Sequence, residues 1–156
     1  MKQKILDIFY KSFSQNDVVS SPYMIAEAGV NHEGKMDLAK QLIDEAAEGG
    51  AHAIKFQTYR ADTIASKDSP AYWDTNKEPT NTQHKLFKKY DKFWKCEYEQ
   101  LKICCDKTGI EFLSTPFDVE SAKFLNDMMD AFKISSSDIT NKPFIEYIAD
   151  FGKPII

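Results

Sequence analysis

The chain has 156 residues, of which 42% are hydrophobic and 28% are charged, and its formal net charge is -4. These values fit one ordinary globular domain and exclude wholesale disorder. The mildly acidic balance argues against a nucleic-acid-binding surface. The N-terminal residues carry charges throughout and contain no secretion signal, and no stretch approaches the roughly 18 apolar residues of a membrane span. We expect a cytoplasmic protein that has neither nucleic acid nor membrane as a partner.

The cysteines and histidines do not form a recognisable metal-binding pattern. Cys96, Cys104 and Cys105 are odd in number and show no CxxC spacing, which argues against a disulfide framework or a zinc site. We interpret Cys104 and Cys105 as small, partly buried helix residues in a reducing cytosol. The histidines show no HxxH or HxH spacing, so we expect His32 to be a surface or core residue and not a metal ligand.

A strand followed by a helix is the recurring pattern from residue 23 onward. Residues 23–28 form a short apolar run, and apolar residues then recur at helical spacing from residue 36 to 47. Residues 53–57 predict the second strand, and residues 98–105 predict the helix that belongs to it. A polar and aromatic insertion, residues 58–95, separates the two. Such long insertions are uncommon and often functional: this one is either a cover for the sheet or a substrate lid.

Two further units and the start of another complete the chain. Residues 111–114 predict the third strand, and Asp118 suits the start of the next helix because a carboxylate accepts from the free amides of the first turn. Residues 131–135 predict the fourth strand, and Pro143 suits the first turn of the helix that follows. Residues 153–156 begin a fifth strand.

This alternation predicts a parallel sheet covered by helices, which is either an open doubly wound sheet or a closed barrel. Polar residues end four consecutive strands and favour the barrel, because all strand ends of a barrel converge on one mouth. We therefore predict the α/β class and a (β/α)₈ TIM barrel. Since a complete barrel takes about 250 residues, we expect residues 23–156 to be its N-terminal half, about strands 1–5, after a leader at residues 1–22. Alone, we expect this half to be inactive and to aggregate, dimerise or behave as a marginal monomer.

Lys55 and Lys133 are the most informative pair of residues. Each lies in or at the end of an apolar strand, where a lysine is costly unless it is paired. One interpretation is that each ammonium reaches solvent from a strand end. The other is that both point into one barrel mouth and bind a ligand with two or three negative charges.

Other polar residues at the strand ends extend this pattern. Thr115 and Ser136 supply hydroxyl groups, which are either ordinary turn residues or part of a phosphate and carboxylate site. Glu27 lies in an apolar strand, where its carboxylate needs a partner. That partner is either a bound ligand or the cation of a structural ion pair, for which Lys55 itself is a candidate. Asp138 either caps the helix that begins near Pro143 or belongs to the predicted ligand site at the strand ends.

Five strings, in order along the chain, resemble the sialic acid synthase family. They are IAEAGVNHEG (residues 25–34), IKFQT (54–58), FLSTPF (112–117), FKISSSD (132–138) and FGKPII (151–156). One such string is weak evidence, whereas five in sequence are specific. The family includes N-acetylneuraminate, legionaminate and pseudaminate synthases. The resemblance implies a transferase that condenses phosphoenolpyruvate with an N-acetylated amino-sugar aldehyde and releases phosphate.

The resemblance also implies roles for particular residues. Phosphoenolpyruvate contacts fall on Lys55, Thr115, Lys133 and Ser136, sugar contacts on Gln57 and Asn31, and catalytic roles on Glu27 and Asp138. Phe56 stands where some relatives carry histidine, and we expect this difference to alter the polarity of the mouth. The implied metal is manganese, with two histidine ligands expected downstream of residue 156. A C-terminal antifreeze-like domain and a homodimer are implied for the full-length protein.

Two other functions remain open from the sequence. A class I aldolase on a TIM barrel would use a barrel lysine to form a Schiff base. A non-catalytic half-barrel would serve only in binding or assembly. The identity of the amino sugar depends on loops and on downstream residues, so the sequence leaves it undetermined.

Overall fold

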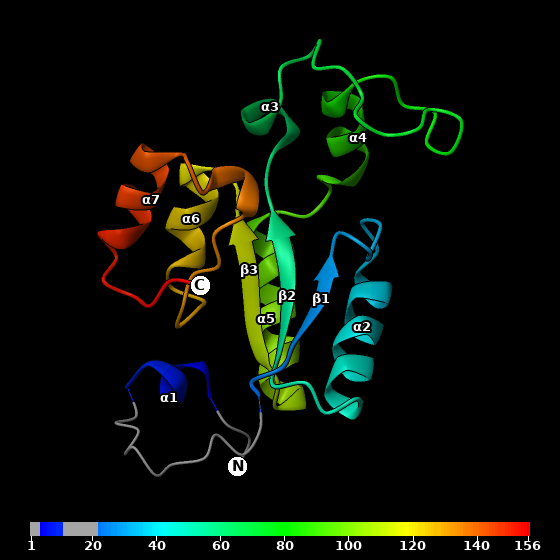
Figure 1. Cartoon of the computed structure of the whole chain (residues 1–156). Helices are drawn as coiled ribbons and strands as arrows, with labels where there is room; N and C mark the ends of the chain where they lie inside the picture. The colour runs from blue at the N-terminus through cyan, green and yellow to red at the C-terminus, as the bar shows by residue number, and fades with distance from the viewer. Residues whose placement is uncertain (1–3, 11–21) are drawn as a thin grey trace.

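The structure, a computed structural model, describes residues 4–10 and 22–156 (Figure 1). Its elements in chain order are α1 (Ile5–Tyr10), β1 (Ile25–Gly29), α2 (Met36–Glu48), β2 (Ala53–Thr58), α3 (Ala61–Ile64), α4 (Gln83–Tyr90), α5 (Lys95–Thr108), β3 (Glu111–Pro116), α6 (Val119–Leu125), the 3-10 helix η1 (Ser136–Asp138) and α7 (Lys142–Ala149). The predicted alternation of strands and helices is confirmed. Most of the predicted leader, residues 1–3 and 11–21, lies outside the described residues. No helix in the described ranges is long and apolar enough to cross a membrane.

The sheet has the order β1-β2-β3, and both neighbouring pairs are parallel. Lys55 lies opposite Glu27 on one side and Leu113 on the other, and Gln57 lies opposite Thr115. Because partners across a ladder point to the same face, Lys55, Gln57 and Thr115 share one face of the sheet. Sequence alternation places Phe56 on the other face.

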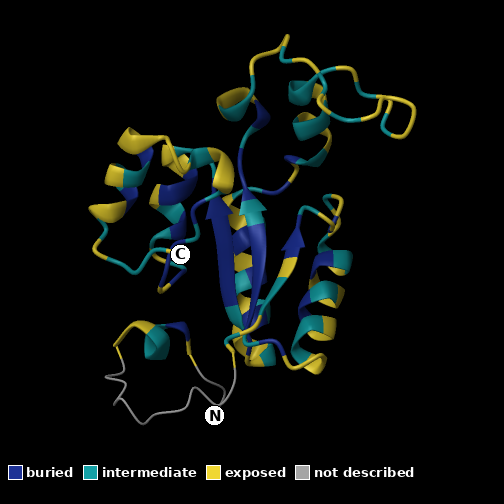
Figure 2. Ribbon diagram, in the orientation of Figure 1, coloured by how far each residue is buried: buried dark blue, intermediate teal, exposed yellow. Residues whose placement is uncertain are grey.

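That other face packs against helices and forms much of the core. Phe56 is fully buried and stacks on Phe112 with ring centroids 5.9 Å apart. Ile43 of α2 and Leu101 of α5 are also fully buried, and Figure 2 shows β2 and β3 as the most continuously buried strands. The expectation that Phe56 alters the polarity of the mouth is therefore wrong, because its ring lies among the core aromatics on the face opposite Lys55.

Local sequence signals explain several helix ends. Asp118 caps α6 as predicted, since its Oδ1 accepts a hydrogen bond of 2.7 Å from the amide of Ser121. Gly109 ends α5 in the left-handed region at φ 76°, where a side chain would be strained. Pro143 occupies the first turn of α7, also as predicted.

The predicted fourth and fifth strands are shorter than expected. Residues 131–135 and 153–156 meet at a single parallel bridge between Phe132 and Ile155. The amide of Phe132 donates to the carbonyl of Pro154 at 2.8 Å, and that of Ile134 donates to Ile156 at 3.0 Å. The two segments thus pair with each other in the predicted direction, but the described sheet contains only β1, β2 and β3.

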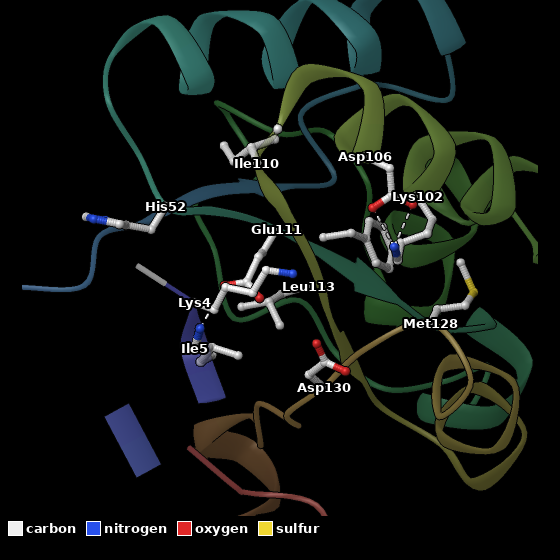
Figure 3. A pocket seen from close by; sticks show the side chains of 12 residues that line it. Lys4, Ile5, His52, Lys102, Asp106, Ile110, Glu111, Leu113, Met128 and Asp130 are labelled. Carbon is white, nitrogen blue, oxygen red and sulfur yellow. Dashed lines mark hydrogen bonds and ion pairs between the residues drawn. The ribbon is translucent and has the colours of Figure 1, made fainter. Parts of the chain in front are cut away.

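Helix α1 lies near the amino ends of β2 and β3, away from the strand tips (Figure 1). The amide of Ile5 donates to Oε2 of Glu111 at 2.8 Å, and the hydroxyl of Tyr23 donates to the same oxygen. Ile5 is buried there at the edge of a cavity of about 290 Å³, which His52 and Asp130 also line (Figure 3). In barrels this end serves stability rather than chemistry, so we assign the cavity no catalytic role.

His32 is a core residue, one of the two outcomes expected from the sequence. It is 1% exposed and stacks on Phe93 with ring centroids 4.1 Å apart. Its Nδ1 accepts from the amide of Gly34 at 3.1 Å, and its Nε2 has no hydrogen-bond partner among the described residues. Burial lowers the pKa of His32 from its ordinary 6.5 to about 4.

This burial predicts a loss of stability in mild acid. The pKa of His32 is lower in the folded chain than in the unfolded chain. Its contribution to stability is therefore fully present above pH 6.5 and is lost as the pH falls toward 4, because in this range only the unfolded chain takes up the proton. The free energy of unfolding should fall by about 3 kcal/mol across this window. Denaturant melts at several pH values measure the slope. His32→Asn keeps an acceptor for the amide of Gly34 but should lose this part of the pH dependence of unfolding. An equal dependence of the free energy of unfolding on pH in both proteins would contradict the prediction.

Candidate active site

The ammonium of Lys55 is the centre of a polar cluster on the sheet. Its Nζ lies 2.6 Å from Oε2 of Glu27 on β1 and donates to Oγ1 of Thr115 on β3 at 3.0 Å. Lys55 is 8% exposed. The ion pair that the sequence left open is therefore present, and three neighbouring strands each supply one member.

The two charged members of the cluster differ in their exposure to solvent. The side chain of Lys55 is 11% exposed, whereas that of Glu27 is 51% exposed. Gln57 lies close by, because a Cβ built on Gly29 would lie 3.4 Å from both Nε2 of Gln57 and Oε1 of Glu27. A buried ammonium needs an anionic partner, and here that partner faces solvent, so a ligand anion can approach the same cation.

A cavity of about 770 Å³ lies beyond the carboxyl ends of the strands. From the strand ends and following turns it is lined by Val30, Gln57, Phe117, Ser135, Ser137, Asp138 and Asn141. From the insertion it is lined by Tyr59, Thr63, Ile64, Tyr72, Gln83, Leu86, Phe87 and Tyr90. It thus combines an aromatic wall with hydroxyl, amide and carboxylate groups, a composition that suits a polar small molecule with apolar substituents.

The aromatic wall comes from the predicted insertion. Figure 1 shows α3 and α4 beyond the arrowheads of β2 and β3. The ring of Tyr59 meets Phe87 edge-on at 5.7 Å and Phe117 edge-on at 5.9 Å. The insertion is therefore packed onto the strand-end turns, which is the position that a substrate lid requires.

The structure brings together only some of the predicted site residues. Glu27, Lys55, Gln57 and Thr115 cluster at the carboxyl ends of the strands, and Asp138 shares the cavity with Gln57. Nζ of Lys133 instead donates to the carbonyl of its neighbour Ile134 at 2.6 Å.

The remaining predicted residues lie in turns. Ser136 is exposed in η1, and Asn31 is exposed in the turn after β1. Asp138 does not cap α7: the N-cap is Asn141, which makes no side-chain capping bond. The carboxylate of Asp138 accepts from the side chain of Asn141 at 3.3 Å, because η1 places it before that helix and beside the cavity.

The sequence analysis missed Tyr59, Phe117 and Asn141 as cavity residues. Each follows directly on a strand end or precedes a helix, where barrel enzymes place functional groups. Their position in the chain could therefore have identified them as cavity residues. Tyr59 and Phe117 were not identified because aromatic residues are normally assigned to the core.

A metal site is not formed by the part of the chain that the structure describes. No group of three or more His, Cys, Asp or Glu side chains is placed to hold an ion in residues 4–10 and 22–156. The carboxylate of Glu27 is engaged by Lys55, and His32 is sequestered among aromatic rings. These donors do not fit a metal centre.

Comparisons with known proteins agree with this architecture. Residues 42–156 match the model of the NeuB family. The N,N'-diacetyllegionaminic acid synthase of Legionella pneumophila is 39% identical over 137 residues, 86% of this chain and 38% of that protein. The N-acetylneuraminate-9-phosphate synthase of Homo sapiens is 30% identical over 135 residues, again 86% of this chain and 38% of that protein.

A solved structure shows the same fold. The crystal structure of an N-acetylneuraminic acid synthetase from Leptospira borgpetersenii superimposes with a TM-score of 0.69 at 36% identity, over 85% of this chain and 42% of that one. The chain thus spans about two fifths of the length of the proteins it matches. The predicted fold class is confirmed as part of a (β/α)₈ barrel, and the open doubly wound sheet is rejected.

The buried ion pair predicts unequal effects of two similar substitutions. Glu27→Gln removes the anion that faces a buried ammonium, so the free energy of unfolding should fall by about 1–2 kcal/mol. Glu33→Gln is the matched control, because its partner Lys35 and Glu33 itself are 68% and 57% exposed, and the change should stay within about 0.5 kcal/mol. Urea denaturation measures both. Equal losses would show that the burial of Lys55 does not matter.

Proposed function

Since the chain belongs to the NeuB family, we propose that it carries part of the active site of a sialic-acid-synthase-type transferase. The reaction condenses phosphoenolpyruvate with an N-acetylated amino-sugar aldehyde, forms a nonulosonic acid and releases phosphate. The observation that carries the proposal is the buried Lys55 ammonium, held by Glu27 and Thr115 beside a large polar and aromatic cavity. Relatives named as synthases of legionaminic acid and of N-acetylneuraminate 9-phosphate support the reaction class.

Lys55 and Thr115 bind the phosphoenolpyruvate anion in this proposal. The carboxylate or phosphate oxygens of the ligand contact the Lys55 ammonium, which Glu27 contacts now, and the neighbouring Thr115 hydroxyl. The binding of a charged ligand by a preorganised cation fixes its position and stabilises charge in the transition state. Lys133 and Ser136 complete this subsite after a rotation of the Lys133 side chain away from the carbonyl of Ile134.

The acceptor sugar occupies the 770 Å³ cavity. Gln57 and Asp138 are the lining residues that meet its polar groups, and Asn31 lies on the neighbouring turn. C3 of phosphoenolpyruvate attacks the aldehyde carbon, water adds at C2, and the C–O bond to phosphate breaks. Glu27 or Asp138 accepts or delivers the proton of that water, since both carboxylates lie at the strand ends.

Several further features belong to the proposal. A divalent metal, manganese by the resemblance, would supply Lewis-acid polarisation of the aldehyde, with histidine ligands from outside residues 1–156. The full-length protein is a homodimer in the cytoplasm, with residues 1–22 as a leader to the barrel domain. Phosphoenolpyruvate and an acetamido sugar are its small-molecule partners.

The Schiff-base aldolase is less well supported by the contacts of Lys55. Its Nζ is engaged by Glu27 and Thr115, whereas an aldolase lysine must attack a carbonyl carbon directly. Borohydride reduction in the presence of pyruvate separates the two reactions. A stable adduct on Lys55 or Lys133, found by mass spectrometry, would establish the aldolase, and its absence is expected.

Turnover tests the proposed reaction class. We expect phosphate release from phosphoenolpyruvate only when manganese and an acetamido or diacetamido hexose are both present, in a full-length protein that carries these residues. A colorimetric phosphate assay with a panel of such sugars measures it. The isolated chain serves to test the half-barrel alternative, because it should bind ligands without turnover. Phosphate release that is independent of every sugar would exclude the condensation.

Substitutions of the lysines test the anion site. Lys55→Met replaces the ammonium by an apolar side chain of similar length, and affinity for phosphoenolpyruvate should fall by about 10- to 100-fold. Lys133→Ala should weaken the same affinity, whereas Lys35→Met removes an exposed lysine and should leave it unchanged. Titration calorimetry measures all three. Unchanged affinity in either of the first two variants removes the role assigned to that lysine.

A further inference from the structure

The insertion supplies more than half of the residues that line the cavity, so its position determines the cavity's shape. We call residues 59–94, which lead from β2 to α5, the connection. Its contribution runs from Tyr59 to Tyr90 and includes both α3 and α4. Long surface segments are normally mobile, and a mobile wall would have to be ordered each time a ligand binds.

Asp91 joins the two ends of the connection. Its Oδ2 accepts from the amide of Ala61, at the start of α3, at 3.0 Å. The same oxygen forms an ion pair with Lys88 of α4 at 3.2 Å, and the carbonyl of Asp91 accepts from Nη1 of Arg60 at 3.3 Å. The side chain of Asp91 is 4% exposed, and Ala61 is fully buried. One buried carboxylate thus ties the outgoing strand end to the returning helix.

Neighbouring contacts join the same two ends of the connection, Arg60–Ala61 and Asp91–Trp94, which we call its neck. The guanidinium of Arg60 lies over the ring of Trp94, 4.4 Å from its centroid, at the point where the connection enters α5. The side chain of Thr63 donates to Oδ2 of Asp118 at 2.9 Å, so α3 is also fixed to the N-cap of α6. Every cavity residue of α3 and α4 lies between Arg60 and Asp91 along the chain.

We propose that Asp91 is a positioning residue for the acceptor sugar, acting by closing the neck of the connection so that Phe87 and Tyr90 form a fixed wall. The inference rests on the proposed function, because it takes the cavity to be the sugar site. Asp91 itself is absent from the cavity lining and does not touch the ligand. Loss of its carboxylate leaves the amide of Ala61 buried without its partner and frees a loop of thirty residues.

The experiment compares three variants of the full-length protein that carries these residues. Asp91→Ala removes both the acceptor for Ala61 and the partner of Lys88. Asp91→Asn keeps an oxygen that can accept from Ala61 and loses only the charge. Asp74→Ala is the matched control, because Asp74 is an exposed carboxylate of the same connection whose side chain bonds only its neighbour Asn76.

Two readouts are measured on each variant. Hydrogen–deuterium exchange follows the amides of residues 61–90 against those of β2 and β3. Titration calorimetry gives the affinities for N-acetylmannosamine and, separately, for phosphoenolpyruvate. In Asp91→Ala we expect exchange of residues 61–90 to accelerate and sugar affinity to fall about tenfold, since a buried charged acceptor is lost. Phosphoenolpyruvate affinity and exchange in β2 and β3 should remain those of the original chain.

Rescue distinguishes positioning from general destabilisation. Asp91→Asn should keep most of the sugar affinity, and Asp74→Ala should keep all of it. Unchanged sugar affinity in Asp91→Ala, or an equal fall for sugar and phosphoenolpyruvate, overturns the proposal. If the unmodified protein binds phosphoenolpyruvate but none of a panel of acetamido and diacetamido hexoses, the proposed sugar site fails instead, and slow exchange of residues 61–90 in Asp91→Ala would then reject the neck as well.

Discussion

The arrangement depends on one buried positive charge. Lys55 lies in the middle strand of the sheet and is 8% exposed, a position where an unpaired ammonium would cost several kcal/mol. Glu27 and Thr115 offset that cost, and they come from the strands on either side. The order β1-β2-β3 and its parallel register are therefore needed for folding and for anion binding alike, since the same contacts satisfy the ammonium and place it at the mouth.

The alternation of β2 separates this polar site from the core. Lys55 and Gln57 point to one face, and Phe56 and Thr58 point to the other, where Phe56 stacks on Phe112 and Thr58 shares a hydrogen bond of 2.6 Å with Ser114. A slip of the strand by one residue would exchange the two sets and bury the site polar groups among helices. The core on the helix face therefore determines which side chains reach the mouth.

Short-range patterns let the sequence predict much of this architecture. The alternating strands, the cap by Asp118 and the pairing option between Glu27 and Lys55 all follow from local spacing and from the cost of burying charge. What the sequence could not give depends on contacts between distant residues. The bond from Ala61 to Asp91 spans 30 positions, and no periodicity announces it. Phe56 is a local case, because the alternation of β2 puts its ring on the face opposite Lys55, where it stacks on Phe112. The bond of the Lys133 ammonium to the carbonyl of its neighbour Ile134 is also local, but no sequence pattern predicts it.

The two ends of the sheet divide stability from chemistry. At the amino ends, Oε2 of Glu111 accepts from both the amide of Ile5 and the hydroxyl of Tyr23, so this oxygen fixes α1 beneath the strands. At the carboxyl ends, the carboxylate of Glu27 is half exposed and that of Asp138 borders a cavity, so both retain capacity for a ligand. Glu111 also borders a cavity, but that cavity lies at the amino ends of the strands, the end that serves stability in barrel proteins. Glu111 and Glu27 are chemically identical, so the end of the sheet at which each lies, rather than residue type, is the basis for assigning one a structural role and the other a functional role.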